Sequence, residues 1–227
     1  MIRHLLQLIW NQRKQNAWLW AELLLVSVFL WFLVDYLYVM GRTYTAPLGF
    51  DIRHTYSIVI SSLSERSPDY IPKEKRERPD GVHLLTALDR IRTYPGVESA
   101  CLTDGGMPYY MGSRNLVWRI DTLQVPCRYA FVTPEFFDVF RIYDKEGETA
   151  SLKRAIEDNN SIVISADVET MNPGLSLLGQ KAYRGNVTDE IEETIRGISV
   201  PIRRHEYTKA EPNVYRALRL SRMEEGY

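Results

Sequence analysis

The stretch AWLWAELLLVSVFLWFLVDYLYVM, residues 17–40, decides how this chain is organised. As a helix it extends about 36 Å, which is enough to cross a hydrocarbon layer of about 30 Å with some tilt. It carries no charge from Leu23 to Val34, and its two acids, Glu22 and Asp35, fall where the helix would meet the headgroups. The stretch therefore predicts a transmembrane helix at 17–40 and not the core helix of a soluble protein.

The residues expected to hold this helix in the membrane are aliphatic in the middle and aromatic toward both ends. Tryptophan and tyrosine side chains favour the boundary between lipid and water, and they mark the two ends here. The predicted membrane anchor consists of Trp18, Trp20, Leu23, Leu24, Leu25, Phe29, Leu30, Trp31, Phe32, Tyr36 and Tyr38.

Three basic residues before this helix predict its orientation. Arg3, Arg13 and Lys14 are accompanied by no acid, and positive flanks stay in the cytoplasm. Everything after Gly41 is then expected outside the cytoplasm. The alternative is a cleaved signal peptide, but its apolar region is normally shorter and a small-residue cleavage site follows it. We interpret the helix as an uncleaved anchor.

The leader before the anchor has a helical pattern of its own. Ile2, Leu5, Leu6 and Ile9 recur at helical spacing with polar residues between them. This pattern predicts an amphipathic helix within residues 1–16 that lies on the inner leaflet. A solvated basic leader is the other interpretation.

The remainder of the chain predicts a mixture of strands and helices. Strands are expected at Thr55–Leu63, Val97–Thr103, Asn115–Ile120, Pro126–Val132, Ser161–Ser165 and Thr194–Ile202, where β-branched or alternating apolar residues gather. Helices are expected from Asp80 to about Tyr94, after Thr133-Pro134 with Phe136, Phe137 and Phe140 buried, at Glu148–Asp158, and briefly from Ala166. The expected class is α+β.

Composition and motifs exclude several kinds of chemistry. The net charge of −1 gives no basic field for nucleic acid. No phosphate-binding loop, nucleophile elbow or metal-ligand spacing is present, so we expect no enzyme, no cofactor and no metal. The acids Glu192-Glu193 are interpreted as a solvated surface pair, and Arg203-Arg204-His205 as a solvated turn in preference to an anion site. Cys101 and Cys127 are small buried residues or, alternatively, a disulfide.

Five segments, in order, resemble the MacB-like periplasmic core of FtsX-type ABC transporter permeases. They are MIRHLLQLIWNQRKQNAW (1–18), LDRIRTYPGVESACLT (88–103), YAFVTPEFFDVFRI (129–142), SIVISADVETM with LLGQKAYRG (161–171 and 177–185), and ETIRGISVPIRRHEYTKAEPNVYRAL (193–218). The resemblance implies a two-lobed mixed α/β periplasmic domain at 41–227 that is incomplete at its C-terminus.

The same resemblance implies a function and partners. A permease subunit of this type couples ATP hydrolysis by a separate cytoplasmic ABC ATPase to periplasmic conformational change and to export or extrusion of substrate. Its partners would be membrane lipid, that ATPase and a second permease subunit, identical or paralogous, in the bacterial inner membrane.

This sequence departs from the family pattern in two respects. It stops before the final strand-and-helix stretch that normally completes the outer domain in the family. Members have three further transmembrane helices after the outer domain, whereas this sequence ends at Tyr227, so it resembles a fragment of a four-span permease or a truncated relative. A membrane-anchored extracytoplasmic sensor module is the alternative function, and an anchored envelope enzyme is a third.

Overall fold

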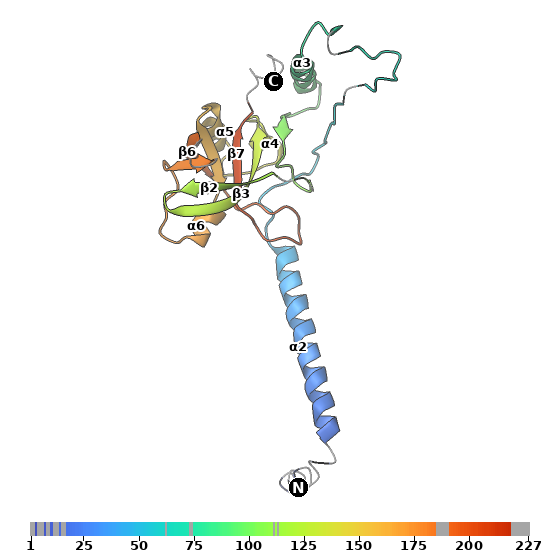
Figure 1. Ribbon diagram of the computed structural model, residues 1–227, viewed down its shortest axis with the longest axis vertical. Helices are drawn as coiled ribbons and strands as arrows, with labels where there is room; N and C mark the ends of the chain where they lie inside the picture. Colours follow the sequence, from blue (N-terminus) through green and yellow to red (C-terminus); the bar gives the residue numbers. More distant parts are fainter. Residues whose placement is uncertain are drawn as a thin grey trace. The chain divides into compact units, whose positions relative to one another are not determined.

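A computed structural model describes Arg3, Gln7, Trp10, Lys14 and residues 17–61, 63–72, 75–110, 112, 114–184 and 191–218 (Figure 1). The chain divides into two compact units, Met1–Ala46 and Pro47–Tyr227, each described by itself below. The expected class is confirmed, because an apolar N-terminal helix precedes a sheet-rich α+β domain.

Helix α2, Ala17–Thr45, is the main element of the first unit. It continues five residues beyond the predicted end at Met40, and the Thr45 hydroxyl donates to the Gly41 carbonyl 3.0 Å away in its last turn. No side chain of this helix is buried by the described protein. The apolar surface of α2 is therefore available to lipid. The predicted helix within residues 1–16 lies almost entirely outside the described residues.

The second unit is built on one sheet of seven strands. Their bounds are β1 Thr103–Asp104, β2 Arg114–Ile120, β3 Leu123–Val132, β4 Ser161–Ser165, β5 Lys181–Arg184, β6 Ile191–Ser199 and β7 Asn213–Ala217. The order is β1-β3-β2-β5-β6-β4-β7, and β7 also pairs in parallel with β3, so the sheet closes into a small barrel. β1 lies outside the closed ring and pairs with β3 alone.

The interior of the barrel is an apolar core to which every strand of the ring contributes. Small barrels are filled by inward-facing side chains, one from every second residue of a strand. The buried cluster consists of Trp118, Ile120, Val125, Cys127, Ile162, Ile164, Val168, Leu177, Ala182, Ile195 and Val214. Val168 belongs to α6, Asp167–Met171, which therefore packs on this interior.

A second apolar core lies between the outer face of the barrel and two helices. These are α4, Phe136–Val139, and α5, Ala150–Glu157. Their apolar side chains pack against Ala130, Val132, Val163 and Tyr215 on the strands. α5 and α6 lie on opposite sides of the strands (Figure 1). Helix α3, Asp80–Arg92, buries Leu88, and Asp80 is its first residue and not the cap expected from the sequence.

One predicted strand is not observed among the described residues, and another is observed only at its last residue. The described part of Thr55–Leu63 has no regular secondary structure, because strand propensity alone forms no strand without a neighbouring strand to bond. Val97–Thr103 forms a strand only at its last residue. The Thr133 hydroxyl accepts the amide of Leu102 at 3.2 Å, so a side chain takes the place of the next ladder bond. This also means that Thr133 does not cap α4.

The other predicted elements are confirmed with shifted ends, and two strands were missed. The final predicted strand at Thr194–Ile202 is observed three residues earlier, as β6. β5 and β7 were not predicted from local pattern. The cysteines are free thiols. Cys127 is buried in the barrel interior, as expected, whereas Cys101 is only partly buried and packs beside the outer core.

Candidate functional site

The structure places all eleven predicted anchor residues on α2 with exposed side chains, from Leu30 at 52% to Trp18 at 76% exposed. Among the described residues α2 is the one helix long and apolar enough to cross a membrane, and a signal sequence near an N-terminus meets the same criteria. Of the residues predicted to set topology, Arg3 and Lys14 are described, and Arg13 lies outside the described residues. Their roles stay predictions.

The outer domain begins with a segment that is bonded to two distant parts of the barrel unit. We call residues 47–55 the junction segment. The Leu48 carbonyl accepts the amide of Arg203 at 3.0 Å, and the amide of Asp51 donates to the Phe140 carbonyl at 2.9 Å. The Thr55 hydroxyl donates to the Val139 carbonyl at 3.4 Å. The chain is thus held at three points within eight residues, immediately after the first unit ends at Ala46.

Glycine at position 49 makes this close approach possible. Gly49 has φ +82°, a backbone conformation that residues with a Cβ rarely adopt. A Cβ added there would lie 2.1 Å from the Pro201 carbonyl oxygen. Next to it, the Phe50 ring packs edge-on to Tyr109 at a centroid distance of 5.8 Å and against the outer core. The junction segment is therefore fitted to its docking position by both backbone and side chain.

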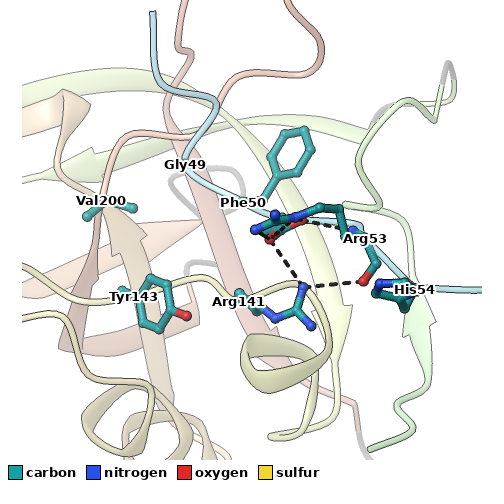
Figure 2. Close-up of a pocket in the computed structure, with 8 residues that line it drawn as sticks. Gly49, Phe50, Arg53, His54, Arg141, Tyr143 and Val200 are labelled. Carbon is teal, nitrogen blue, oxygen red and sulfur yellow. Dashed lines mark hydrogen bonds and ion pairs between the residues drawn. The ribbon is translucent and has the colours of Figure 1, made fainter.

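A charged triad of Asp51, Arg53 and Arg141 joins the junction segment to the residue that follows α4 by two. Arg53 donates to both oxygens of the Asp51 carboxylate. Its Nη2 lies 2.7 Å from Oδ2, and its Nε lies 2.9 Å from Oδ2 and 3.2 Å from Oδ1. Arg141, which follows α4, places Nη1 3.2 Å from the same Oδ2 and 3.3 Å from the Arg53 carbonyl. Figure 2 shows Arg53 and Arg141 joined by these bonds. The hydrogen bonds from Arg53 hold the pKa of the Asp51 carboxyl well below its ordinary value, and Asp51 in turn raises the pKa of Arg53.

The triad lies at an open cavity of about 610 Å³. Its wall is formed by Gly49, Phe50, Asp51, Arg53, His54, Arg141, Tyr143 and Val200. Tyr143 and Val200 stand at the side of the cavity away from His54 (Figure 2). The wall offers two guanidinium groups, an imidazole and a phenol against one carboxylate, and this balance suits a small anionic group.

Glu193 and Arg203 were both expected to be solvated, but both are buried. For Glu193 the reason is that neighbouring residues in a strand point to opposite faces. Glu193 on β6 is 2% exposed and pairs with Arg216 on β7, while Glu192 pairs with Lys181 at the surface. Arg203 is 4% exposed, and its Nε donates to the Thr208 carbonyl at 2.7 Å within its own loop.

Burial also limits the chemistry of the thiols. It raises the pKa of Cys101 and of Cys127 to about 12 each, so both stay protonated and weakly nucleophilic at neutral pH. Within the described ranges no three histidine, cysteine or carboxylate side chains lie together as metal ligands would.

Comparisons with known proteins give a likeness of fold. No protein-family model and no curated protein sequence matches the chain. The periplasmic region of MacB from Actinobacillus actinomycetemcomitans is similar over 59% of this chain and 54% of that one, with 10% identity and a TM-score of 0.41. The extracellular domain of the noncanonic ABC-type transporter YknZ from Gram-positive bacteria is similar over 63% and 66%, with 12% identity and a TM-score of 0.42. The chain thus spans about half and two thirds of these structures.

Proposed function

We propose that this chain is a permease subunit, or part of one, of a MacB/FtsX-type ABC transporter. In this role α2 crosses the bacterial inner membrane with its N-terminus in the cytoplasm, and the unit Pro47–Tyr227 lies in the periplasm. A separate cytoplasmic ATPase hydrolyses ATP, and the chain passes the resulting movement to the outer domain for export or extrusion of substrate. The chain itself catalyses no reaction.

The observation that carries this proposal is the junction segment. A flexible tether between anchor and domain would allow the helix to move without moving the domain. Here the chain is hydrogen-bonded to Arg203 from Leu48 and to Phe140 from Asp51, within five residues of the end of the first unit. In the proposed role, force applied to α2 reaches the barrel unit through this segment. The five ordered segments that resemble the permease family support the same conclusion.

The orientation can be tested with single cysteines in a Cys101→Ala/Cys127→Ala background. A membrane-impermeant maleimide added to intact spheroplasts should label Lys145→Cys, which lies on the exposed turn before α5. Lys14→Cys should be labelled only after lysis. The reverse pattern contradicts the proposed topology.

The transport function is tested by purifying the tagged full chain from membranes in mild detergent. We expect it to bring down a second permease subunit and an ABC ATPase in stoichiometric amounts. Arg53→Ala/Arg141→Ala, which removes the triad, should keep this complex but weaken the coupling of ATP hydrolysis to conformational change in the outer domain. Arg114→Ala removes an exposed ion pair with Asp104 and serves as the control. Purification without any ATPase would contradict the proposal.

A second candidate function is ligand sensing, which the cavity at the junction favours. A sensor of this kind would bind a small dicarboxylate or phosphate between Arg53 and Arg141. Titration of the full chain with succinate and with inorganic phosphate, followed by its thermal unfolding, separates the two functions. A saturable stabilisation that Arg141→Ala abolishes, in a chain that purifies without an ATPase, would favour the sensor.

A further inference from the structure

The outer domain exposes an apolar segment that no described residue covers. In Tyr56–Ile60, Tyr56 and Val59 are each 86% exposed, Ile58 is 63% and Ile60 54% exposed. The segment runs as an extended thread away from the barrel (Figure 1, light blue), and no strand among the described residues pairs with it. Exposure of so many apolar side chains next to unbonded backbone marks a site of interaction.

The sequence of this segment is that of a strand with one buried face. Tyr56, Ile58 and Ile60 are all apolar and project to one side of an extended chain, whereas Ser57 and Ser61 flank Val59 on the other side. This alternation is typical of a strand that packs one face on a core. Among the described strands none lies beside this segment, and Thr55 at its start donates to the Val139 carbonyl.

Two copies of the segment complement one another. In an antiparallel pair centred on Val59, Ile58 of each copy faces Ile60 of the other, so the apolar residues of both strands share one face. No residue from Thr55 to Leu63 is charged, and therefore no like charges oppose each other across the pair. A two-fold axis, the usual symmetry of homodimers, relates two strands in this antiparallel arrangement when it lies perpendicular to them.

We propose that residues 55–61 pair with the same segment of a second copy of this chain, forming an antiparallel β-ribbon that joins two outer domains. The inference rests on the proposed function in one respect, because a permease subunit of this type acts with a second subunit. Anchoring of both chains in one membrane raises their effective concentration, so a ribbon of a few residues is sufficient to hold the domains together.

The first test is a cysteine scan from Tyr56 to Ser61, in the Cys101→Ala/Cys127→Ala background, on the full chain in membranes. Mild oxidation should give a disulfide-linked dimer most strongly with Val59→Cys, because this residue faces itself in the pair. Ser57→Cys should cross-link poorly alone and well when mixed with Ser61→Cys. A scan without a maximum, or without dimer, overturns the proposal. Burial of the segment in lipid or against its own domain would give the latter result.

The second test breaks the ribbon. Ile58→Lys/Ile60→Lys places like charges opposite each other and should reduce the cross-linked dimer at position 59 about tenfold, which corresponds to about 1.4 kcal/mol. Tyr94→Lys/Leu178→Lys is the matched control, because these apolar side chains are exposed to a similar extent, 69% and 61%. Equal dimer in both variants overturns the proposal.

Failure of the ribbon and failure of the transport function give different results. If the ATPase and second subunit still copurify with a chain that never cross-links at Val59, only the ribbon is wrong. If Val59→Cys cross-links but no ATPase is recovered, the ribbon stands and the transport function is wrong.

Discussion

Asp51 gathers two arginines from different parts of the chain, yet its surroundings are exposed. The Arg53 side chain is 83% exposed, and ion pairs in such positions contribute little to stability because water and salt screen them. The triad therefore matters more for the conformation of the chain than for its stability. Two guanidinium groups on one carboxylate favour one conformation of residues 51–53 beside Arg141.

Acidification should loosen the junction. Since the pKa of Asp51 is held below its ordinary value of 3.8 in the folded chain, the contribution of the triad is complete above that pH and declines as the pH falls further. The carboxyl ¹³C shift of Asp51, followed by NMR, should therefore titrate well below pH 3.8 in the wild type. In Arg53→Ala/Arg141→Ala the midpoint should rise toward 3.8, and an unchanged midpoint would show that the arginines are not the cause.

Gly49→Ala should destabilise the outer domain. The new Cβ meets the Pro201 carbonyl, and alanine disfavours φ +82°, so the free energy of unfolding should fall by about 1–3 kcal/mol. Gly174→Ala is the control, because that residue also has positive φ but open space around it. Chemical denaturation of both variants measures the difference. Equal losses would mean that contact with Pro201 plays no part.

The buried pair of Glu193 and Arg216 makes a different prediction. Arg216 also lies over the Phe131 ring at 5.0 Å, and Arg184 Nε lies 3.5 Å from the second Glu193 oxygen. Either Glu193→Gln or Arg216→Met alone should cost about 3–5 kcal/mol, because a buried charge then loses its partner.

The double variant Glu193→Gln/Arg216→Met should lose less than the sum of the two single losses, and a double-mutant cycle of denaturation midpoints measures this coupling. Additive losses would contradict the pairing. Glu192→Gln, at the neighbouring exposed position, should barely change stability.

At the scale of elements, α4 is a helix of four residues that aromatic packing maintains. Phe136 is fully buried and its ring centroid lies 4.7 Å from Phe140 and 5.5 Å from Tyr215. Phe136→Ala should lower the free energy of unfolding by about 3–5 kcal/mol. Tyr94→Ala, at an exposed position, should change it by less than about 0.5 kcal/mol. A small loss in Phe136→Ala, measured by denaturation, would show that the core collapses around the gap.

The elements that the sequence predicted correctly carry a strong local pattern. β4 is a run of five buried residues, and α5 has its apolar residues on one face. β7 was missed because both its faces are buried and Arg216 interrupts the apolar pattern, and β5 because it has four residues. The strand expected at Thr55–Leu63 shows the converse, since its pattern is strong but no described strand pairs with it.

The site could be predicted only in part. The apolar helix α2 was predictable because a run of apolar residues needs no tertiary partner. The junction was not, because Asp51 and Arg141 are far apart in sequence and meet only through the path of the chain after α4. Gly49 had a local signal, a glycine soon after the anchor, but its contact with Pro201 depends on the closed barrel.

For the whole molecule, α2 should decide where the protein resides. Leu30 lies near the middle of the helix, where arginine costs about 2.5–3.5 kcal/mol in membrane insertion. Leu30→Arg should shift the chain from the carbonate-resistant membrane pellet toward the soluble fraction, as measured by immunoblot. Leu178→Arg, in the outer domain, should remain in the pellet. Equal distribution of the two variants would contradict the role of α2 as the anchor.

The docking of the junction segment also sets an order of events during biosynthesis. Leu48 emerges from the ribosome early, soon after α2, but Arg203, to which it bonds, is made near the end of the described chain. In the proposed topology, α2 therefore enters the membrane while the residues after it are still undocked. Residues 47–55 can dock only once β6 and the following loop, which contains Arg203, have been made and folded. Nascent chains halted before Arg203 should accordingly leave residues 47–55 open to protease, whereas complete chains protect them.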